Sequence, residues 1–532
     1  MRSGSVSSRQ APVTDVKSCE AWLRRAALAD ARQACRELTA LLESFEEASP
    51  PAGALIDILE RLREPIFVAQ AEHAKRFAGR PLPIKDFEIA AFEQVGDLWT
   101  ALGRSYRRLL RSAVEDGVAE LRQRKALLAQ RALDCVSELM QVHYRGRREI
   151  DGDVWRDLHQ LYQIAEHEEV ALTTVSAGLR SKSVSTCTEV YLRALLLALA
   201  NPYGLAAREL AWTRRWSTMW AYKVDLVSAA DDAQGYAVDL AGNASPTWLT
   251  AQGATPTMRF LDTSSLRRSV RSRVKKLDSG VDPQTLGLGK DCVQPDVGRL
   301  LVQLARAWVE APAPRQFTRR LAAERTEVTS GMQAIHLAIT GRAFKSAARH
   351  WDYSRRDAEQ LHIYQGVAPP GAGDGPTGFA TEKWETLDES ATGFRLRRKG
   401  PGERLSLGQL IALRPEGART FILSDVRWLM MGIDGSLTIG AGVLPGLAKG
   451  VAVRPVTLPT SVPEPYSQAF VLSNSAGQLT SLVLPSGWFQ MDRTLEMRDE
   501  DETMAQVKLT GLVHRGYDYD RANFSVVGSI ST

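Results

Sequence analysis

Apolar residues recur three and four positions apart along the first part of the chain, with polar residues between them. One such stripe is formed by Phe92, Val95, Trp99 and Leu102. Residues at this spacing lie on one face of a helix, so the pattern predicts amphipathic helices that bury this face. We therefore expect an all-α helical region over residues 17–230. The preceding residues 1–16 are rich in Ser, Arg and Gln and are expected to form a disordered tail.

Trp212, Trp216 and Trp220 lie four positions apart, on one face of a predicted helix. An exposed aromatic face of this kind would bind a protein partner, whereas a buried one would pack between helices. Each buried aromatic side chain removes about 150 to 250 Å² from water, so burial is the stronger prediction. The three rings are expected to belong to the helical core.

The pattern changes after residue 230. Residues 231–262 are rich in Gly, Ser, Thr and Pro with short apolar pairs, which predicts strands and turns. Residues 263–312 return to helical spacing and predict a helical connector. Further along, alternating apolar residues predict antiparallel β-structure that continues to the C-terminus, with a proline-rich break near residue 459.

Within the connector, residues 264–277 predict a basic helix. Its apolar face is formed by Leu266, Val270, Val274 and Leu277, and arginines and lysines surround that face. A helix of this type can bind nucleic acid or an acidic membrane. A solvated polar face explains the same pattern more often, and it is our prediction here. Nucleic-acid contact through residues 267–276 is kept as a weaker alternative.

The composition is that of an ordinary folded protein. A length of 532 residues is too great for one compact core and indicates two to four domains. The net charge of +5 is small for this length, so nucleic acid is not expected as a partner. The five cysteines are far apart and form no CxxC pair, which argues against a disulfide framework. We expect reduced thiols and a cytoplasmic protein.

No stretch of the chain is expected to cross a membrane. The most apolar run, residues 190–200, is interrupted by Arg193 and is too short for a bilayer. The first 18 residues are polar and lack the apolar core of a secretory signal. Neither a membrane span nor export is therefore predicted.

Two short motifs carry the candidate chemistry. Arg315 and Arg319 are four residues apart, with Arg320 adjacent, and a run of Asp, Glu, Ser, Ala, Thr and Gly follows at residues 388–393. A guanidinium donates two parallel hydrogen bonds to a phosphate or to a guanine edge and remains charged at any relevant pH. A carboxylate accepts from guanine N–H groups, and glycine lets the backbone approach a ligand closely.

Read in this order, the RxxxR and DxSxxG motifs resemble those of the PilZ family of cyclic di-GMP receptors. Further along, Gly408 before an apolar strand, the triplet Val426, Arg427 and Trp428, and the pair Ile439 and Gly440 are similar to strands of the PilZ barrel. The resemblance covers residues 315–456, about a quarter of the chain. It implies a PilZ-like antiparallel β-barrel over residues 313–458. Together with the helical pattern before it and the strand pattern after it, the sequence predicts a multidomain protein: an all-α helical N-terminal region, this barrel, and a small C-terminal β extension over residues 459–532.

The resemblance also implies the ligand and its site. Cyclic di-GMP would be bound by Arg315, Arg319 and Arg320 together with Asp388, Ser390 and Gly393. The two motifs are separated by far more than the usual hairpin, so we expect an insertion over residues 345–380. Loop-closure entropy rises slowly with loop length, so the barrel tolerates such an insertion.

Other chemistry is weakly represented. The sequence contains no HExxH and no GxSxG motif, so no metal, cofactor or catalytic residue is predicted, and we expect the protein not to be an enzyme. His159 and His167 are eight residues apart and are expected on a helix surface.

Two functions follow from these observations. The first is a cyclic di-GMP effector that couples the level of the second messenger to a protein partner through its helical region, with motility, pili or biofilm formation as the output that the resemblance implies. The alternative is a non-enzymatic protein-interaction scaffold whose PilZ-like barrel no longer binds ligand.

Overall fold

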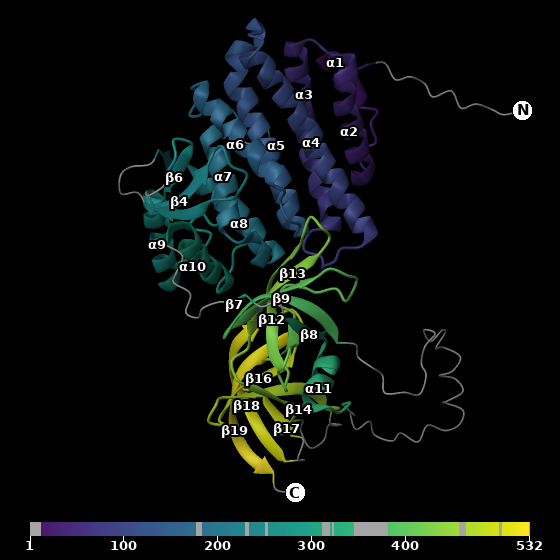
Figure 1. Cartoon of the computed structure of the whole chain (residues 1–532), viewed down its shortest axis with the longest axis vertical. Coiled ribbons are helices and arrows are strands. Elements are labelled where there is room, and N and C mark those ends of the chain that lie inside the picture. The colour runs from purple at the N-terminus through teal and green to yellow at the C-terminus, as the bar shows by residue number, and fades with distance from the viewer. Residues whose placement is uncertain are drawn as a thin grey trace, which may run out of the picture. The chain divides into compact units, whose positions relative to one another are not determined.

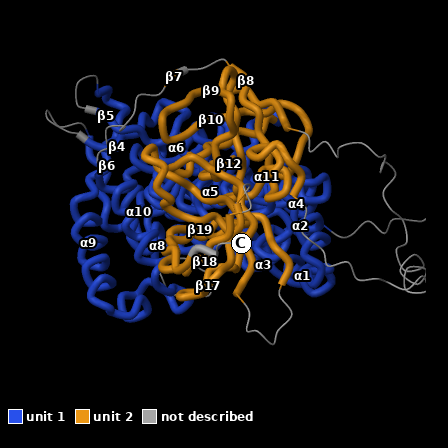
Figure 2. The backbone as a smooth tube through the Cα atoms, turned by 90° about the horizontal axis from the view of Figure 1, so that it is seen from below, with its two compact units in different colours: residues 1–315, 430–435 blue, residues 316–429, 436–532 orange. Residues whose placement is uncertain are grey.

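The computed structural model describes residues 12–176, 184–228, 234–250, 254–310, 320–321, 324–344, 381–456, 464–499 and 503–530. Two compact units make up the chain (Figure 2). The first contains residues 1–315 and 430–435, and the second contains residues 316–429 and 436–532. Most of the predicted tail and the predicted insertion at 345–380 lie outside the described residues.

The first unit is mainly helical, as expected (Figure 1). Its helices are α1 (Val16–Leu23), α2 (Ala31–Ala48), α3 (Ala52–His73), α4 (Asp86–Val114), α5 (Lys125–Gly146), α6 (Gly152–His167), α7 (Cys187–Leu199), α8 (Ala207–Trp220), α9 (Ser264–Asp278) and α10 (Asp296–Val309). Capping residues set several starts: the side chains of Asp15, Asp30 and Thr186 accept from backbone N–H groups of the first turn. A strand pair, β1 (Val175–Ser176) with β2 (Val184–Ser185), precedes α7.

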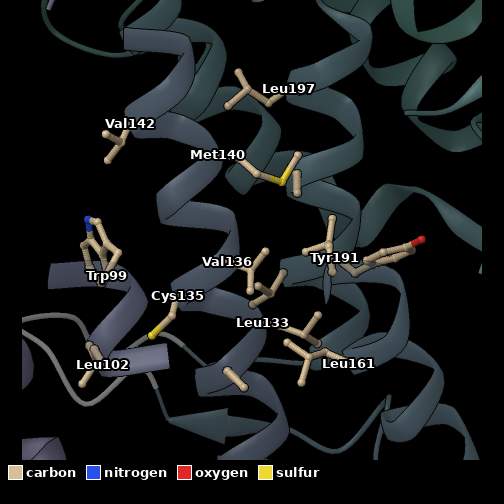
Figure 3. Packing of buried hydrophobic residues seen from close by; sticks show 14 of the residues in the cluster. Trp99, Leu102, Leu133, Cys135, Val136, Met140, Val142, Leu161, Tyr191 and Leu197 are labelled. Atoms are coloured by element: carbon tan, nitrogen blue, oxygen red, sulfur yellow. The ribbon is translucent and has the colours of Figure 1, made fainter. Parts of the chain in front are cut away.

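Helix α5 lies at the centre of this unit and is buried along most of its length. In Figure 3 its Cys135 lies on the side of Trp99 and Leu102 of α4, whereas Leu133 lies on the side of Tyr191 of α7. A helix surrounded on this scale also buries polar side chains, which must then find partners. The paired groups on α5 are Arg131 with Glu60, Asp134 with Arg193, and Glu138 with Arg214.

The tryptophan ladder is buried, which confirms the sequence prediction. Trp212, Trp216 and Trp220 are at most 1% exposed, and neighbouring rings stack with centroids about 6 Å apart. Trp308 of α10 meets Trp220 edge to face and donates its Nε1–H to the Leu196 carbonyl at 2.7 Å. Helices α9 and α10 therefore belong to the core of the first unit, and the prediction that residues 263–312 form a mere connector is wrong.

The basic helix α9 buries Leu266, Val270 and Leu277, as its apolar stripe predicts. Arg273 lies over the ring of Trp220 at 5.2 Å. Next to this helix in the sequence is a four-stranded antiparallel sheet in the order β3-β6-β4-β5. Its strands are β3 (Asp225–Val227), β4 (Gln234–Asp239), β5 (Thr247–Thr250) and β6 (Met258–Asp262). The strand segment predicted at 231–262 thus begins slightly earlier, at Asp225.

The second unit contains two closed β-barrels. The first barrel is formed by β8 (Arg325–Ser330), β9 (Glu382–Ser390), β10 (Gly393–Arg398), β11 (Leu410–Pro415), β12 (Ile422–Met431) and β13 (Leu437–Val443). The strand order is β10-β13-β12-β11-β8-β9, and the pairing of β9 with β10 closes the ring. The short β7 (Arg320–Leu321) pairs with residues 388–389 of β9, beyond residues 382–385 of that strand, which pair with β8. All the strands expected from the sequence motifs lie in this barrel.

The second barrel is closed as well, in the order β14-β15-β16-β19-β18-β17. Its strands are β14 (Leu447–Pro455), β15 (Ser467–Ser473), β16 (Leu479–Pro485), β17 (Thr494–Arg498), β18 (Met504–Arg515) and β19 (Tyr519–Ile530). Two predictions need correction: the C-terminal part is a complete barrel rather than a small extension, and the boundary at 458 is wrong. Strand β14 pairs with β15 and β17, so the second barrel starts before residue 458.

An apolar seam joins the two barrels. It combines residues of both, together with α11 (Met332–Thr340), in one buried cluster: Ile335, Leu410, Ala412, Leu423, Leu444, Phe470, Leu472, Val483 and Tyr519. Polar contacts cross the same seam. The hydroxyl of Tyr519 donates to Asp425 at 2.8 Å, and Asp518 accepts from the Leu410 N–H at 2.8 Å. The barrels consequently share one core.

Replacing Tyr519 by phenylalanine should destabilise the second unit. Asp425 is fully buried, and loss of one hydrogen bond to a buried carboxylate costs about 1–3 kcal/mol. Urea unfolding of the whole protein should show a lower midpoint for the transition of this unit. Tyr517→Phe is the matched control, because Tyr517 is 60% exposed. Equal midpoints for both variants would show that the hydrogen bond contributes nothing.

Candidate functional site

The DxSxxG motif forms the hairpin that closes the first barrel. Ser390, at the end of β9, pairs with Gly393, at the start of β10, across the two-residue turn 391–392. The Ser390 hydroxyl donates to the Gly393 carbonyl at 3.3 Å. Three predicted site residues, Asp388, Ser390 and Gly393, are thus brought together on one hairpin.

Asp388 pairs across the hairpin with Arg395, and the two side chains form an ion pair with Nε and Oδ2 2.8 Å apart. Strand β9 has a β-bulge at this point: the next pair along the hairpin is Leu396 with Thr386, so Leu387 has no partner on β10. The Asp388 side chain is only 9% exposed, whereas that of Arg395 is 41% exposed. The carboxylate is therefore held in place, and the guanidinium reaches the surface.

Glycines form a floor beside this ion pair. On β13, Gly440 pairs with Arg395 and Gly442 pairs with Gly393. A Cβ at Gly393 would lie 2.7 Å from the Ala441 carbonyl oxygen, so only glycine fits. We use the term glycine floor for Gly393, Gly440 and Gly442.

Two side chains of β12 lie over this floor. A Cβ at Gly440 would lie 2.0 Å from Nε1 of Trp428, and a Cβ at Gly442 would lie 2.7 Å from Nε of Arg427. The indole and the guanidinium thus occupy the space that larger residues would fill. Trp428 is half-buried, whereas the Arg427 side chain is 54% exposed.

Arg427 connects the glycine floor with the seam between the barrels. Its Nε lies 2.6 Å from Oδ1 of Asp425, whose Oδ2 accepts from Tyr519 of the second barrel. The imidazole of His514 lies 3.6 Å from the same oxygen. Because this carboxylate is only 1% exposed, these partners replace the hydrogen bonds that water would otherwise supply.

The predicted arginines are described only in part. Arg320 lies on β7 opposite Glu389 of β9, next to the Leu321–Asp388 pair, and its side chain is 70% exposed. Its Nη2 lies 2.7 Å from a carboxylate oxygen of Glu389. Arg320 therefore reaches the edge of the motif strand. Arg315 and Arg319 lie outside the described residues.

A hollow of about 590 Å³ lies farther along the same two strands. Glu385 and Arg397 line it, and they form the ion pair that follows Asp388 and Arg395 along the hairpin. Arg398 and Trp384 line it as well. The hollow thus extends beside the candidate site rather than beneath Asp388.

Sequence reasoning missed Arg395 and the role of Arg427 and Trp428, which the motif analysis treated only as strand residues. One signal for these residues was present in the sequence. Gly440 and Gly442 are at alternate positions of a predicted strand, so one face of that strand lacks side chains at two neighbouring positions and leaves room for other side chains. Only the three-dimensional structure shows that Trp428 and Arg427 of β12 fill this space.

The sequence-based expectation for His159 is wrong. His159 is not on a helix surface: it is fully buried, and its ring nitrogens lie 2.7 Å from the Tyr191 hydroxyl and 2.9 Å from the Ala244 carbonyl oxygen. Among the described residues, no group of histidine, cysteine and acidic side chains has the arrangement of a metal site. The five cysteines are buried and unpaired.

A helical unit joined to tandem barrels, with charged side chains around a glycine floor that Trp428 and Arg427 cover, has the build of a binding protein. Two family models match the chain: "Cyclic-di-GMP receptor FimW, N-terminal domain" over residues 17–231 and "FimW C-terminal beta-barrel domain" over residues 451–527. Together they cover more than half of the chain, which therefore belongs to the FimW family of cyclic-di-GMP receptors, and the family's ligand is cyclic di-GMP. No curated protein matches the chain.

The matches correspond well to the fold. The first covers most of the helical unit, the second covers the second barrel, and the first barrel lies in the interval between them. No helix within the described ranges is both long enough and apolar enough to cross a membrane.

Gly393→Ala should destabilise the first barrel by about 1–3 kcal/mol, because its Cβ would overlap the Ala441 carbonyl oxygen and force β10 away from β13. Gly400→Ala is the control, since its Cβ would meet no atom within 4 Å. Thermal unfolding followed by circular dichroism compares the two. If both variants melt together, β10 and β13 are not held as closely as described.

Proposed function

We propose that this protein binds cyclic di-GMP on the outer face of the first barrel, which acts as a PilZ-type receptor module. The observation that carries the proposal is the union of Asp388, Ser390 and Gly393 on one hairpin beside the glycine floor, in a chain of a cyclic-di-GMP receptor family.

The β9–β10 hairpin, which carries the DxSxxG motif, would bind the edge of a guanine base. The Asp388 carboxylate accepts from guanine N1–H and N2–H, and Arg395 fixes its orientation from the neighbouring strand. Ser390 offers a small hydroxyl at the turn. The half-exposed guanidinium of Arg395 is free on its outer side to donate to the ligand as well.

The arginines supply the phosphate contacts. Arg315 and Arg319 are assigned here from their motif, and Arg320 from its place on β7 beside the motif strand. Ligand phosphates would draw Arg320 from Glu389, an exposed ion pair that contributes little stability by itself. Ordering of this segment over the ligand is the conformational response that we propose.

The side chains that lie over the glycine floor suit a planar base. The indole of Trp428 covers Gly440 and the guanidinium of Arg427 covers Gly442, so these two side chains offer a base an aromatic and a cationic surface to lie against. Arg427 lies at the far end of the floor, where its exposed guanidinium can meet a second phosphate. The four strands β9, β10, β13 and β12 thus present consecutive contacts for one dinucleotide.

In the cell, the protein would act as a cytoplasmic effector of cyclic di-GMP. Ligand binding shifts the protein between two arrangements by its differential affinity for them, and a protein partner bound by the helical region reads the change. Motility, pili or biofilm formation are the outputs to which this activity belongs.

Isothermal calorimetry with cyclic di-GMP tests the site. Asp388→Asn keeps the shape of the side chain but removes its charge, and should weaken binding about tenfold or more, since a good base contact discriminates by about 1–3 kcal/mol. Adding Arg315→Ala and Arg319→Ala should weaken binding further, by several factors of ten. Arg419→Ala, an exposed arginine between β11 and β12, should bind like the unaltered protein. Unchanged affinity in the triple variant would refute this site.

One observation favours the alternative of a ligand-silent scaffold. Asp388 is nearly buried and is already paired with Arg395, so a ligand must share or displace that partner. This alternative predicts no nucleotide-dependent shift in melting temperature and a protein partner that co-purifies with the helical unit. A clear shift with cyclic di-GMP would exclude it.

A further inference from the structure

The helical unit contains a cavity that the barrel site does not use. Its volume is about 350 Å³, and it opens between α3, α5, α8 and the turn that follows α3. Its floor is apolar and is provided by Tyr144, Leu197 and Leu205, which are at most 4% exposed. Pockets for small molecules in proteins begin at about this size.

Small residues explain why the space is open. Ala71 and Gly79 on one side face Ala207 and Ala211 of α8 on the other, and all four are exposed at the mouth. A Cβ at Gly79 would lie 3.2 Å from that of Ala207, so the two sides are already close there. Larger side chains at these positions would close the cavity.

Three arginines line the cavity, and only one of them has a carboxylate partner. Arg214 donates to both oxygens of Glu138, at 2.8 and 2.9 Å. Arg147 is buried and donates to the carbonyls of Tyr203 and Leu205. Arg145 reaches only the amide oxygen of Gln70, at 3.5 Å. Within the described residues the cavity therefore carries a surplus of positive charge.

The pKa values of Arg145 and Arg147 are lowered, as this surplus would cause. Burial lowers the pKa of Arg147 to about 10. Burial and the neighbouring Arg214 charge both lower the pKa of Arg145. Each effect expresses a cation that lacks a compensating anion in a poorly solvated place.

We infer that this cavity binds an amphipathic organic anion: a small molecule with an apolar or aromatic body and one carboxylate or phosphate group. The body would lie against Tyr144, Leu197 and Leu205, and the anionic group would accept from Arg145 at the rim. Cyclic di-GMP, with two phosphates and two bases, is too bulky and too polar for this floor. The site is thus separate from the one proposed on the barrel.

A fluorescent anion tests the inference on the full-length protein. The probe 8-anilinonaphthalene-1-sulfonate combines an aromatic body with one anionic group, and its emission rises in apolar surroundings. Arg145→Gln should weaken its binding about tenfold or more, which corresponds to about 1.4 kcal/mol. Arg104→Gln removes a charge from an exposed position on α4 and should leave binding unchanged.

Two further measurements make the result decisive. N-phenyl-1-naphthylamine, a neutral analogue, should bind the unaltered protein more weakly than the sulfonate does. Its affinity for Arg145→Gln should equal its affinity for the unaltered protein. Ala211→Trp fills the mouth from an exposed helical position and should abolish binding of both probes, with circular dichroism and melting temperature unchanged. Equal sulfonate affinity for the unaltered protein, Arg145→Gln and Ala211→Trp would overturn the inference.

Discussion

The pairing of β9 with β10 is the constraint on which the barrel unit depends. Without it the first barrel is an open sheet with two exposed edges; with it, β9 is paired on both sides and the ring is closed. The hairpin turn that enforces this closure also carries Asp388, Ser390 and Gly393. Closure of the barrel and the proposed ligand contacts therefore depend on the same few residues. The register shift at Leu387 places the Asp388 carboxylate opposite Arg395.

The two barrels function as one folded body because their seam is both apolar and polar. Leu410 and Phe470 share a buried cluster, and Tyr519 of one barrel donates to Asp425 of the other. Since Arg427 pairs with that same carboxylate and also covers Gly442, the glycine floor is only two side chains away from the second barrel. An anion that draws Arg427 outward would leave Asp425 more dependent on Tyr519 and His514. The architecture thus gives a physical route from the floor to the seam.

The helical unit rests on a different principle. Helix α5 is enclosed on nearly all sides, so its charged residues survive only by pairing: Arg131 with Glu60, Asp134 with Arg193. A buried pair of this kind is costly to break because the remaining charge has no solvent. Where the pairing is incomplete, as at Arg145 and Arg147, the excess charge lies at a cavity. The cavity thus differs from the rest of the described helical core in that its buried positive charges are not all paired with carboxylates.

The sequence by itself determined what is local: helical stripes, the burial of Trp212, Trp216 and Trp220, and the strand–turn–strand character of the Asp388 motif. Side-chain period and turn chemistry are properties of a few neighbouring residues, so they can be read from the chain. Only the tertiary structure decided that β14 belongs to the second barrel, that α9 and α10 join the helical core, and that Arg395 and Trp428 border the glycine floor. Those outcomes depend on which distant segments pair and in which register. An alternating strand satisfies its local pattern equally well beside several neighbours, and the choice is made by the burial that each pairing achieves across the whole fold.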